Sequence, residues 1–244
     1  MTALADATVA QTAAALSNHG LCIRGIVRTS ANLHVDYPFG DTKSIVLVGH
    51  LGSSFWPHFE TWLNEQPQLA DPLDAWSKQV LNAIGATLNA RMCLPSDGPP
   101  FMPFQRLALQ AEPLSVSPLK LLMHPEAGLW HAYRGALLFN VDFTDGENGA
   151  TRIDEATPVA PTPCEQCASR VCLDTCPVAA FDGGHYDTDR CFEYLQTNAG
   201  RECVAKGCRS RRACPVGTAY QYDDAEMQFH MRAFIQSRIG AREV

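Results

Sequence analysis

The chain concentrates eight of its ten cysteines between residues 164 and 214. They form two groups of four, and each group ends in a Cys-Pro pair. Cysteine thiolates bind both zinc and iron–sulfur clusters, so the spacing has to distinguish the two kinds of site. The groups read Cys164-x2-Cys167-x4-Cys172-x3-Cys176 and Cys191-x11-Cys203-x4-Cys208-x5-Cys214.

The spacing of the first group favours iron–sulfur clusters. It keeps both ends of the bacterial ferredoxin run C-x2-C-x2-C-x3-C-P, whose fourth cysteine ligates the other of two clusters, and it inserts two residues in the middle. A proline after the fourth cysteine can open a helix and turn that thiolate away from its neighbours. If both groups exchange their last cysteine, the eight thiolates supply two complete sets, and we predict two 4Fe-4S clusters. The predicted sets are Cys164, Cys167, Cys172 and Cys214, and Cys176, Cys191, Cys203 and Cys208.

Structural zinc and disulfides are the alternatives to clusters. Zinc sites favour paired C-x2-C knuckles, and only Cys164 and Cys167 form such a pair. The N-terminal stretch 1–16 lacks the basic start and compact apolar centre of a secretory signal, so we expect a cytoplasmic, reducing location. Disulfides are rare there. The isolated Cys22 and Cys93 are expected to be small buried hydrophobes.

The bulk composition describes a globular chain and excludes several classes. The chain has 244 residues, 46% of them hydrophobic, and a formal net charge of −7. No apolar run reaches the roughly 18 residues that span a bilayer, so we expect no membrane partner. The acidic balance makes nucleic acid an unlikely partner. Motifs of serine hydrolases, P-loop kinases, HExxH metalloproteases and dinucleotide-binding enzymes are missing from the sequence.

Periodicity and turn residues predict alternating helices and strands in residues 1–148, which we expect to form one α+β domain. Ser53 and Ser54 are the expected caps of one helix. A linker is expected at 149–163, which holds three prolines, followed by a two-cluster domain at 164–218 and a closing helix in 219–244 that packs back. The expected helices are 3–17, the stretch after Ser54, the stretch after Asp71-Pro72, and 105–112; the expected strands are 21–27, 44–48 and 135–143.

Residues 176–196, CPVAAFDGGHYDTDRCFEYLQ, resemble the ferredoxin part of epoxyqueuosine reductases and related corrinoid-dependent reductases. The shared features are the Cys-Pro pair, a Tyr and an Asp shortly before Arg-Cys, and a following Tyr-Leu. This chain lacks the second C-x2-C of that pattern, which leaves the assignment of Cys203 and Cys208 between the two clusters open.

The front part resembles a second family, the cobalamin-processing chaperones with cyanocobalamin reductase and alkylcobalamin dealkylase activity. The resemblance lies in MHPEAGLWHAYRGALL (123–138), in SIVLVGHLGSSFWPHFETWL (44–63) and in Asp-Pro-Leu-Asp (71–74). Both families share a flavin-reductase-like, nitroreductase-type α+β scaffold and bind cobalamin. The resemblance therefore implies such a sheet-and-helix domain, followed by a ferredoxin-like domain with two 4Fe-4S clusters.

The same resemblance places His124, Trp130, Tyr133 and Arg134 near a corrin ring. Each residue also has an ordinary structural explanation. The histidine can be a core residue bonded to backbone, the two aromatic rings can belong to the core, and the arginine can pair with an acidic side chain.

These features predict an iron–sulfur redox protein, a corrinoid-binding reductase that passes electrons through two clusters to cobalt or to a small substrate. Its redox partner would be a ferredoxin, a flavodoxin or a reductase. A ferredoxin-type electron-transfer module without its own catalysis is the alternative. Modification of tRNA, as by epoxyqueuosine reductases, ranks lower because the chain is acidic.

Overall fold

The computed structural model describes residues 2–29, 37–66, 69–143 and 161–242. Two compact units make up the chain. The first consists of Met1–Pro113 and Ala132–Thr157, and the second of Leu114–His131 and Pro158–Val244. The predicted boundary at 149–163 gives a different grouping, because it assigns Leu114–His131 to the first domain. Most of that predicted linker, 149–160, lies outside the described residues.

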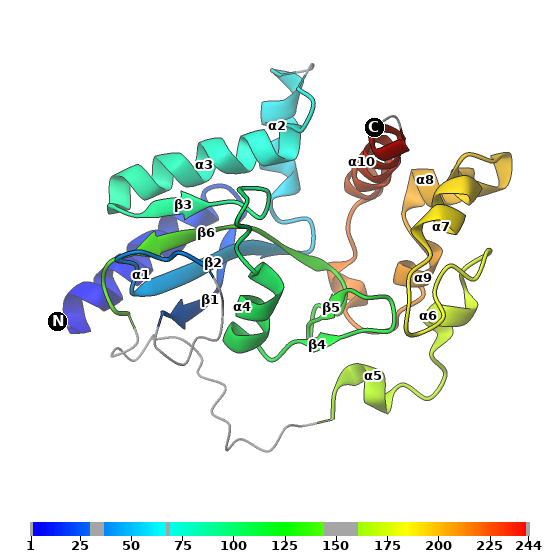
Figure 1. Cartoon of the computed structure of the whole chain (residues 1–244), viewed down its shortest axis with the longest axis horizontal. Coiled ribbons are helices and arrows are strands. Elements are labelled where there is room, and N and C mark those ends of the chain that lie inside the picture. Colours follow the sequence, from blue (N-terminus) through cyan, green and yellow to red (C-terminus); the bar gives the residue numbers. More distant parts are fainter. Residues whose placement is uncertain (1, 30–36, 67–68, 144–160, 243–244) are drawn as a thin grey trace. The chain divides into compact units, whose positions relative to one another are not determined.

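A four-stranded sheet in the order β1-β2-β6-β3 forms the centre of the first unit (Figure 1). Strand β2 is buried along its whole length except at its last residue, as its continuous apolar run predicts. Strands β1 and β2 are antiparallel, and so are β3 and β6. The strands are β1 Cys22–Arg28, β2 Ser44–Leu51, β3 Arg91–Cys93 and β6 His131–Phe139.

Helices cover this sheet and supply its aromatic core. Helices α1 and α4 contact β1, and α3 contacts β3, α1 and α2. Phe55, Phe59 and Trp76 form a buried aromatic cluster, with ring centroids 5.6 to 6.1 Å apart. The helices are α1 Thr2–Ser17, α2 Trp56–Asn64, α3 Pro72–Leu88 and α4 Phe104–Ala111.

The expected serine caps of α2 are wrong. The residue that precedes the helix is Phe55, and no side chain caps the helix there. Ser54 Oγ instead donates a hydrogen bond to the Gly20 carbonyl oxygen at 2.7 Å. The serine thus joins the chain before α2 to the turn after α1.

The second unit consists mostly of short elements. Strands β4 Ser115–Val116 and β5 Leu122–Met123 form an antiparallel pair. The longest helix, α10 Asp224–Arg242, packs against α8 and α7 (Figure 1). The other helices are α5 Pro163–Gln166, α6 Val171–Asp174, α7 Thr188–Leu195, α8 Arg201–Lys206, α9 Arg209–Arg212 and the 3-10 turns Asn198–Gly200 and Thr218–Tyr220.

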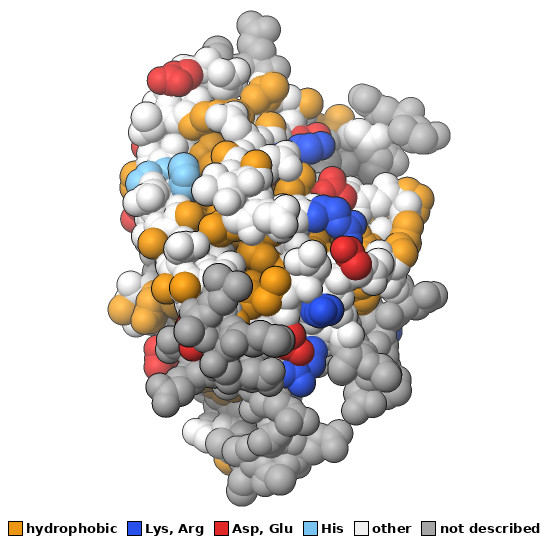
Figure 2. All heavy atoms as spheres, turned by 90° about the vertical axis from the view of Figure 1, so that its left-hand side faces the viewer, with side chains coloured by type: hydrophobic (Ala, Val, Ile, Leu, Met, Phe, Trp, Pro, Cys, Tyr) orange, Lys and Arg blue, Asp and Glu red, His pale blue; other side chains and the backbone are white. Residues whose placement is uncertain are grey.

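The described surface is mixed in character. On the face shown in Figure 2, basic and acidic side chains lie close together, with apolar side chains scattered between them. Within the described ranges, no helix combines the length and the apolar character needed to cross a bilayer. The mixed helix-and-sheet class predicted from the sequence is confirmed, since an antiparallel sheet and separate helices are both present.

Candidate metal centres

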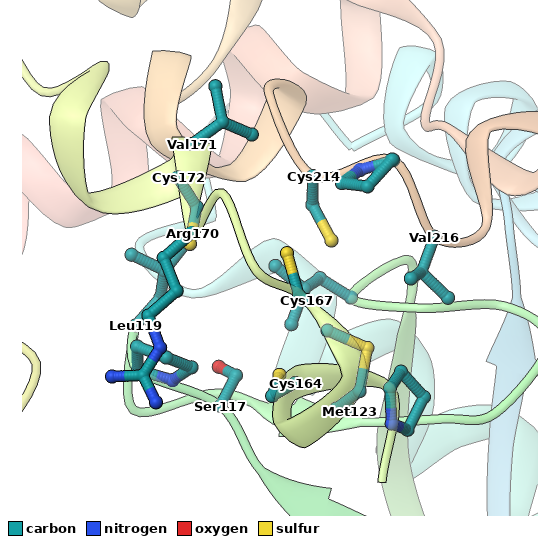
Figure 3. Close-up of a pocket in the computed structure, with 14 residues that line it drawn as sticks. Ser117, Leu119, Met123, Cys164, Cys167, Arg170, Val171, Cys172, Cys214 and Val216 are labelled. Atoms are coloured by element: carbon teal, nitrogen blue, oxygen red, sulfur yellow. The ribbon is translucent and has the colours of Figure 1, made fainter.

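Four of the clustered cysteines line one pocket of the second unit. Figure 3 shows the sulfur atoms of Cys167 and Cys214 facing each other across it. Cys164 lies on α5 and Cys172 on α6, while Cys167 and Cys214 follow α5 and α9. The rest of the wall is mainly apolar. It includes Leu119, Met123, Leu129 and Val216.

Local structure holds the first cysteine of this pocket in place. Thr162 caps α5 through a capping box: its Oγ1 accepts from the Glu165 N–H at 3.3 Å, and its own N–H donates to Glu165 Oε2 at 2.7 Å. Pro163 occupies the first turn, where a missing N–H costs nothing. The capping box and Pro163 therefore fix the N-terminal end of the short helix that carries Cys164.

The remaining four cysteines line a second pocket of the same unit, together with Ser210, Tyr194 and Met231. Cys191 lies on α7 and Cys203 on α8, and Cys208 immediately precedes α9. Cys176, just before Pro177, completes the set. Cys214 lines the first pocket and Cys176 the second, so each pocket is lined by four cysteines. The assignment of these cysteines as cluster ligands stays a prediction.

Donor groups stabilise the thiolate forms of the cysteines in the second pocket. The Ala180 N–H donates a hydrogen bond to Cys176 Sγ at 3.3 Å. The backbone N–H groups of Arg211 and Ser210 act to lower the pKa of Cys208, and that of Arg209 acts to lower the pKa of Cys203. The Tyr186 hydroxyl acts in the same direction on the pKa of Cys191. Donors aimed at sulfur stabilise thiolates and are common around iron–sulfur clusters.

Burial and mutual repulsion disfavour isolated thiolates in both pockets. Burial raises the pKa of Cys191 to about 11, although the Tyr186 hydroxyl opposes this shift. Burial also raises the pKa of Cys164, and the neighbouring Cys214, Cys172 and Cys167 raise it further. A buried group of thiolates needs positive charge among them, which a bound metal or cluster supplies.

The sulfur arrangement does not match a single-ion site. Among the described residues, no group of three or more His, Cys, Asp or Glu side chains has the geometry to hold one metal ion. A cubane places iron and sulfide between its ligands, so it spaces four thiolates more widely than one ion does. All ten cysteines carry free thiols. The clusters themselves stay a prediction.

Two of the predicted corrin-binding residues lie in the second unit. His124 Nδ1 accepts hydrogen bonds from the N–H groups of Glu126 and Ala127, at 3.1 and 3.0 Å. Trp130 is 1% exposed, and its ring lies 4.4 Å from the Arg211 guanidinium. The histidine thus stabilises a turn, and the tryptophan packs in a core.

The other two predicted residues lie in the first unit. The Tyr133 hydroxyl donates to Glu112, which forms a bidentate pair with Arg24 through two contacts of 2.9 Å. Burial and the Glu112 carboxylate raise the pKa of Tyr133. The Arg134 guanidinium lies 5.9 Å from the centre of the Phe55 ring.

Sequence reasoning missed several groups around these sites. The buried pair of Arg24 and Glu112 was not identified, although an arginine inside the apolar strand CIRGIVR is an unusual signal. Leu119, Met123 and Leu129 were assigned to the first domain, yet they line the first cysteine pocket. Ser210 carries no signal in the sequence, because its neighbours Arg209, Arg211 and Arg212 do not indicate burial.

No protein-family model and no curated protein matches the chain. Among solved structures, the chain is similar to a Caenorhabditis elegans B12-trafficking protein, CblC, a homologue of human MMACHC. The TM-score is 0.58 at 13% identity, over 96% of this chain and 97% of that one. It is also similar to an epoxyqueuosine reductase, crystallised with a tRNA stem loop, with a TM-score of 0.47 at 16% identity. That match covers 93% of this chain and 62% of the reductase. Both families resembled by the sequence are therefore among the structural neighbours.

Proposed function

We propose that this protein is an iron–sulfur redox protein with two 4Fe-4S clusters that acts on a corrinoid. The observation that carries the proposal is the division of eight cysteines between two four-cysteine pockets. Cys164, Cys167, Cys172 and Cys214 would hold one cluster, and Cys176, Cys191, Cys203 and Cys208 the other. In finer terms, the second unit is then a ferredoxin-like domain with two clusters.

The residues around the cysteines are suited to binding iron–sulfur clusters. Leucine, methionine and valine side chains make much of the wall of the first pocket apolar. The Ala180 N–H on Cys176, and the donor groups that act to lower the pKa of Cys191, Cys203 and Cys208, favour the anionic, ligating form. Bound clusters would supply one-electron transfer.

The corrinoid part of the proposal rests on the likeness in fold to the B12-trafficking protein, which extends over nearly the whole chain. The sequence segments 44–63 and 123–138 support it independently. We propose a nitroreductase-like first unit that receives the corrinoid as substrate. His124, Trp130, Tyr133 and Arg134 remain the candidates near the corrin, and their present contacts favour supporting roles for the first two.

Electrons would enter from a ferredoxin, a flavodoxin or a reductase, pass through the clusters, and reduce cobalt. This sequence of electron transfers requires a cluster in each of the two pockets. It also separates the proposal from a simple electron-transfer module, because a module would cycle its clusters without altering the corrinoid.

Iron analysis tests the two clusters. Protein purified without oxygen should contain about eight iron and eight sulfide per chain. Cys176→Ser and Cys214→Ser should each lose about half of the iron, because each removes a ligand from a different pocket. Cys22→Ser should keep all of it. Wild-type protein without iron would overturn the proposal.

A spectroscopic experiment tests the corrinoid. Dithionite-reduced protein, freed of reductant by gel filtration, is mixed with aquacobalamin, and the visible spectrum is followed. We expect conversion to cob(II)alamin and co-elution of corrinoid with the protein. Cys176→Ser and Cys214→Ser should slow the conversion. An unchanged spectrum with intact clusters removes the corrinoid and leaves the electron-transfer module.

A further inference from the structure

Ser210 is a buried polar residue that the proposed redox role does not yet use. Its side chain is only 1% exposed, and it lies on the short helix α9. Within the described part of the chain, no hydrogen-bond partner is within reach of its Oγ. Buried hydroxyl groups are rarely left without a partner, so this one calls for an acceptor.

The position of Ser210 indicates what that acceptor is. The residue lines the second pocket, together with Cys176, Cys191, Cys203 and Cys208. Several other wall residues are apolar, among them Val178, Phe181, Leu195 and Met231. The Ser210 backbone N–H acts to lower the pKa of Cys208. Ser210 therefore belongs to the wall of the four-cysteine pocket and follows the ligand candidate Cys208 by two residues.

We propose that the Ser210 hydroxyl donates a hydrogen bond to a sulfur of the cluster in the second pocket and raises the reduction potential of that cluster. This inference rests on the proposed two-cluster function. Reduction adds one electron to a cluster, and a donor on sulfur stabilises the more negative state. The hydroxyl keeps its proton in both states, so one electron is gained and no proton moves.

The first pocket offers a matched comparison. Ser117 also lines its pocket and is also buried, but its Oγ already accepts a hydrogen bond from the Leu121 N–H at 3.3 Å. Loss of the Ser117 hydroxyl should leave the potential of the second-pocket cluster unchanged. Ser210 should act on that cluster alone.

An anaerobic redox titration followed by electron paramagnetic resonance tests the proposal. The second-pocket cluster is observed by itself in a Cys214→Ser background. We expect Ser210→Ala to shift its potential to more negative values at full iron content of that pocket. Ser210→Thr should stay near the parent value, and Ser117→Ala should have no effect on it.

If the second pocket of Ser210→Ala binds little iron, variants of matched size still test the proposal. Threonine and valine have nearly the same shape, but only threonine carries the hydroxyl. Iron loss from the second pocket in Ser210→Ala and Ser210→Val, with retention in Ser210→Thr, also supports the contact. Equal potentials in the loaded variants, or iron loss in all three, would overturn it. Iron-free wild-type protein would instead reject the two-cluster function itself.

Discussion

The two compact units achieve their order in different ways. The first is built from a continuous sheet and helices of up to 17 residues around an aromatic core. In the second, α5, α6 and α9 have four residues each, and eight cysteines line the two pockets beside them. Helices of this length are unstable by themselves. The comparison indicates that side-chain packing orders the first unit, whereas the proposed clusters would complete the second.

Removal of the clusters should produce the largest difference in amide protection between the two units. After oxidation and chelation of iron, we expect amide hydrogens in 161–220 to exchange at least about a hundredfold faster, because metal binding and folding are coupled. Those of β2, which is buried, should change little. Hydrogen exchange read by mass spectrometry gives both values in one experiment. Equal loss of protection in the two units would show that the comparison is wrong.

Breaking the buried ion pair should weaken the first unit by itself. Glu112→Gln leaves the Arg24 guanidinium, 2% exposed in its side chain, without its anionic partner. We expect a loss of about 3 kcal/mol in the free energy of unfolding, with the iron content unchanged. Denaturant titration measures it.

Glu202→Gln is the matched control in the second unit. Glu202 contacts Arg212 at 2.8 Å, but its side chain is 51% exposed. An exposed pair contributes at most about 1 kcal/mol. If Glu112→Gln and Glu202→Gln lowered the free energy of unfolding equally, burial of the ion pair would not explain the loss.

A backbone substitution beside the first cysteine pocket should damage the second unit. Gly128 has φ +60°, and an added Cβ would lie 2.2 Å from the Val216 carbonyl oxygen. Gly128→Ala therefore requires Val216, which lines the pocket, to move. We expect a loss of about 2 to 3 kcal/mol, lower iron content and a lower melting temperature.

Gly183→Ala separates the clash from backbone strain. Gly183 has φ +87°, but an added Cβ would meet only Leu173 Cδ1, at 3.6 Å. The left-handed conformation alone should cost about 1 kcal/mol. Similar iron content in the two variants would argue against a role of Val216 in the pocket.

The smallest expected effect is a pH dependence of the first unit. Burial, and secondly the nearby His58, lower the pKa of His19 below 6.5. The unfolded chain then binds more protons near that pH, so stability is present above 6.5 and is lost as pH falls through the lower, folded pKa. His19→Gln should flatten this dependence in urea titrations at pH 7.5 and 5.5. An unaltered slope in the variant would assign the dependence to other groups.

Much of the chemistry followed from local sequence. Cysteine spacing and the repeated Cys-Pro pair led to two sets of four, because a short loop limits which thiolates can meet. The apolar run at β2 and the Asp71-Pro72 start of α3 were likewise readable, since neighbouring residues alone decide them.

Tertiary structure decided what depends on residues far apart in the chain. Cys203 and Cys208, left open by the sequence, line the pocket of Cys176 and Cys191. Leu129 reaches the first cysteine pocket from a segment that the sequence assigned elsewhere. Arg24 and Glu112 are 88 positions apart, and the burial of Ser210 depends on the elements packed around it. Pairing and burial of this kind arise only when the whole chain has folded, so no local pattern records them.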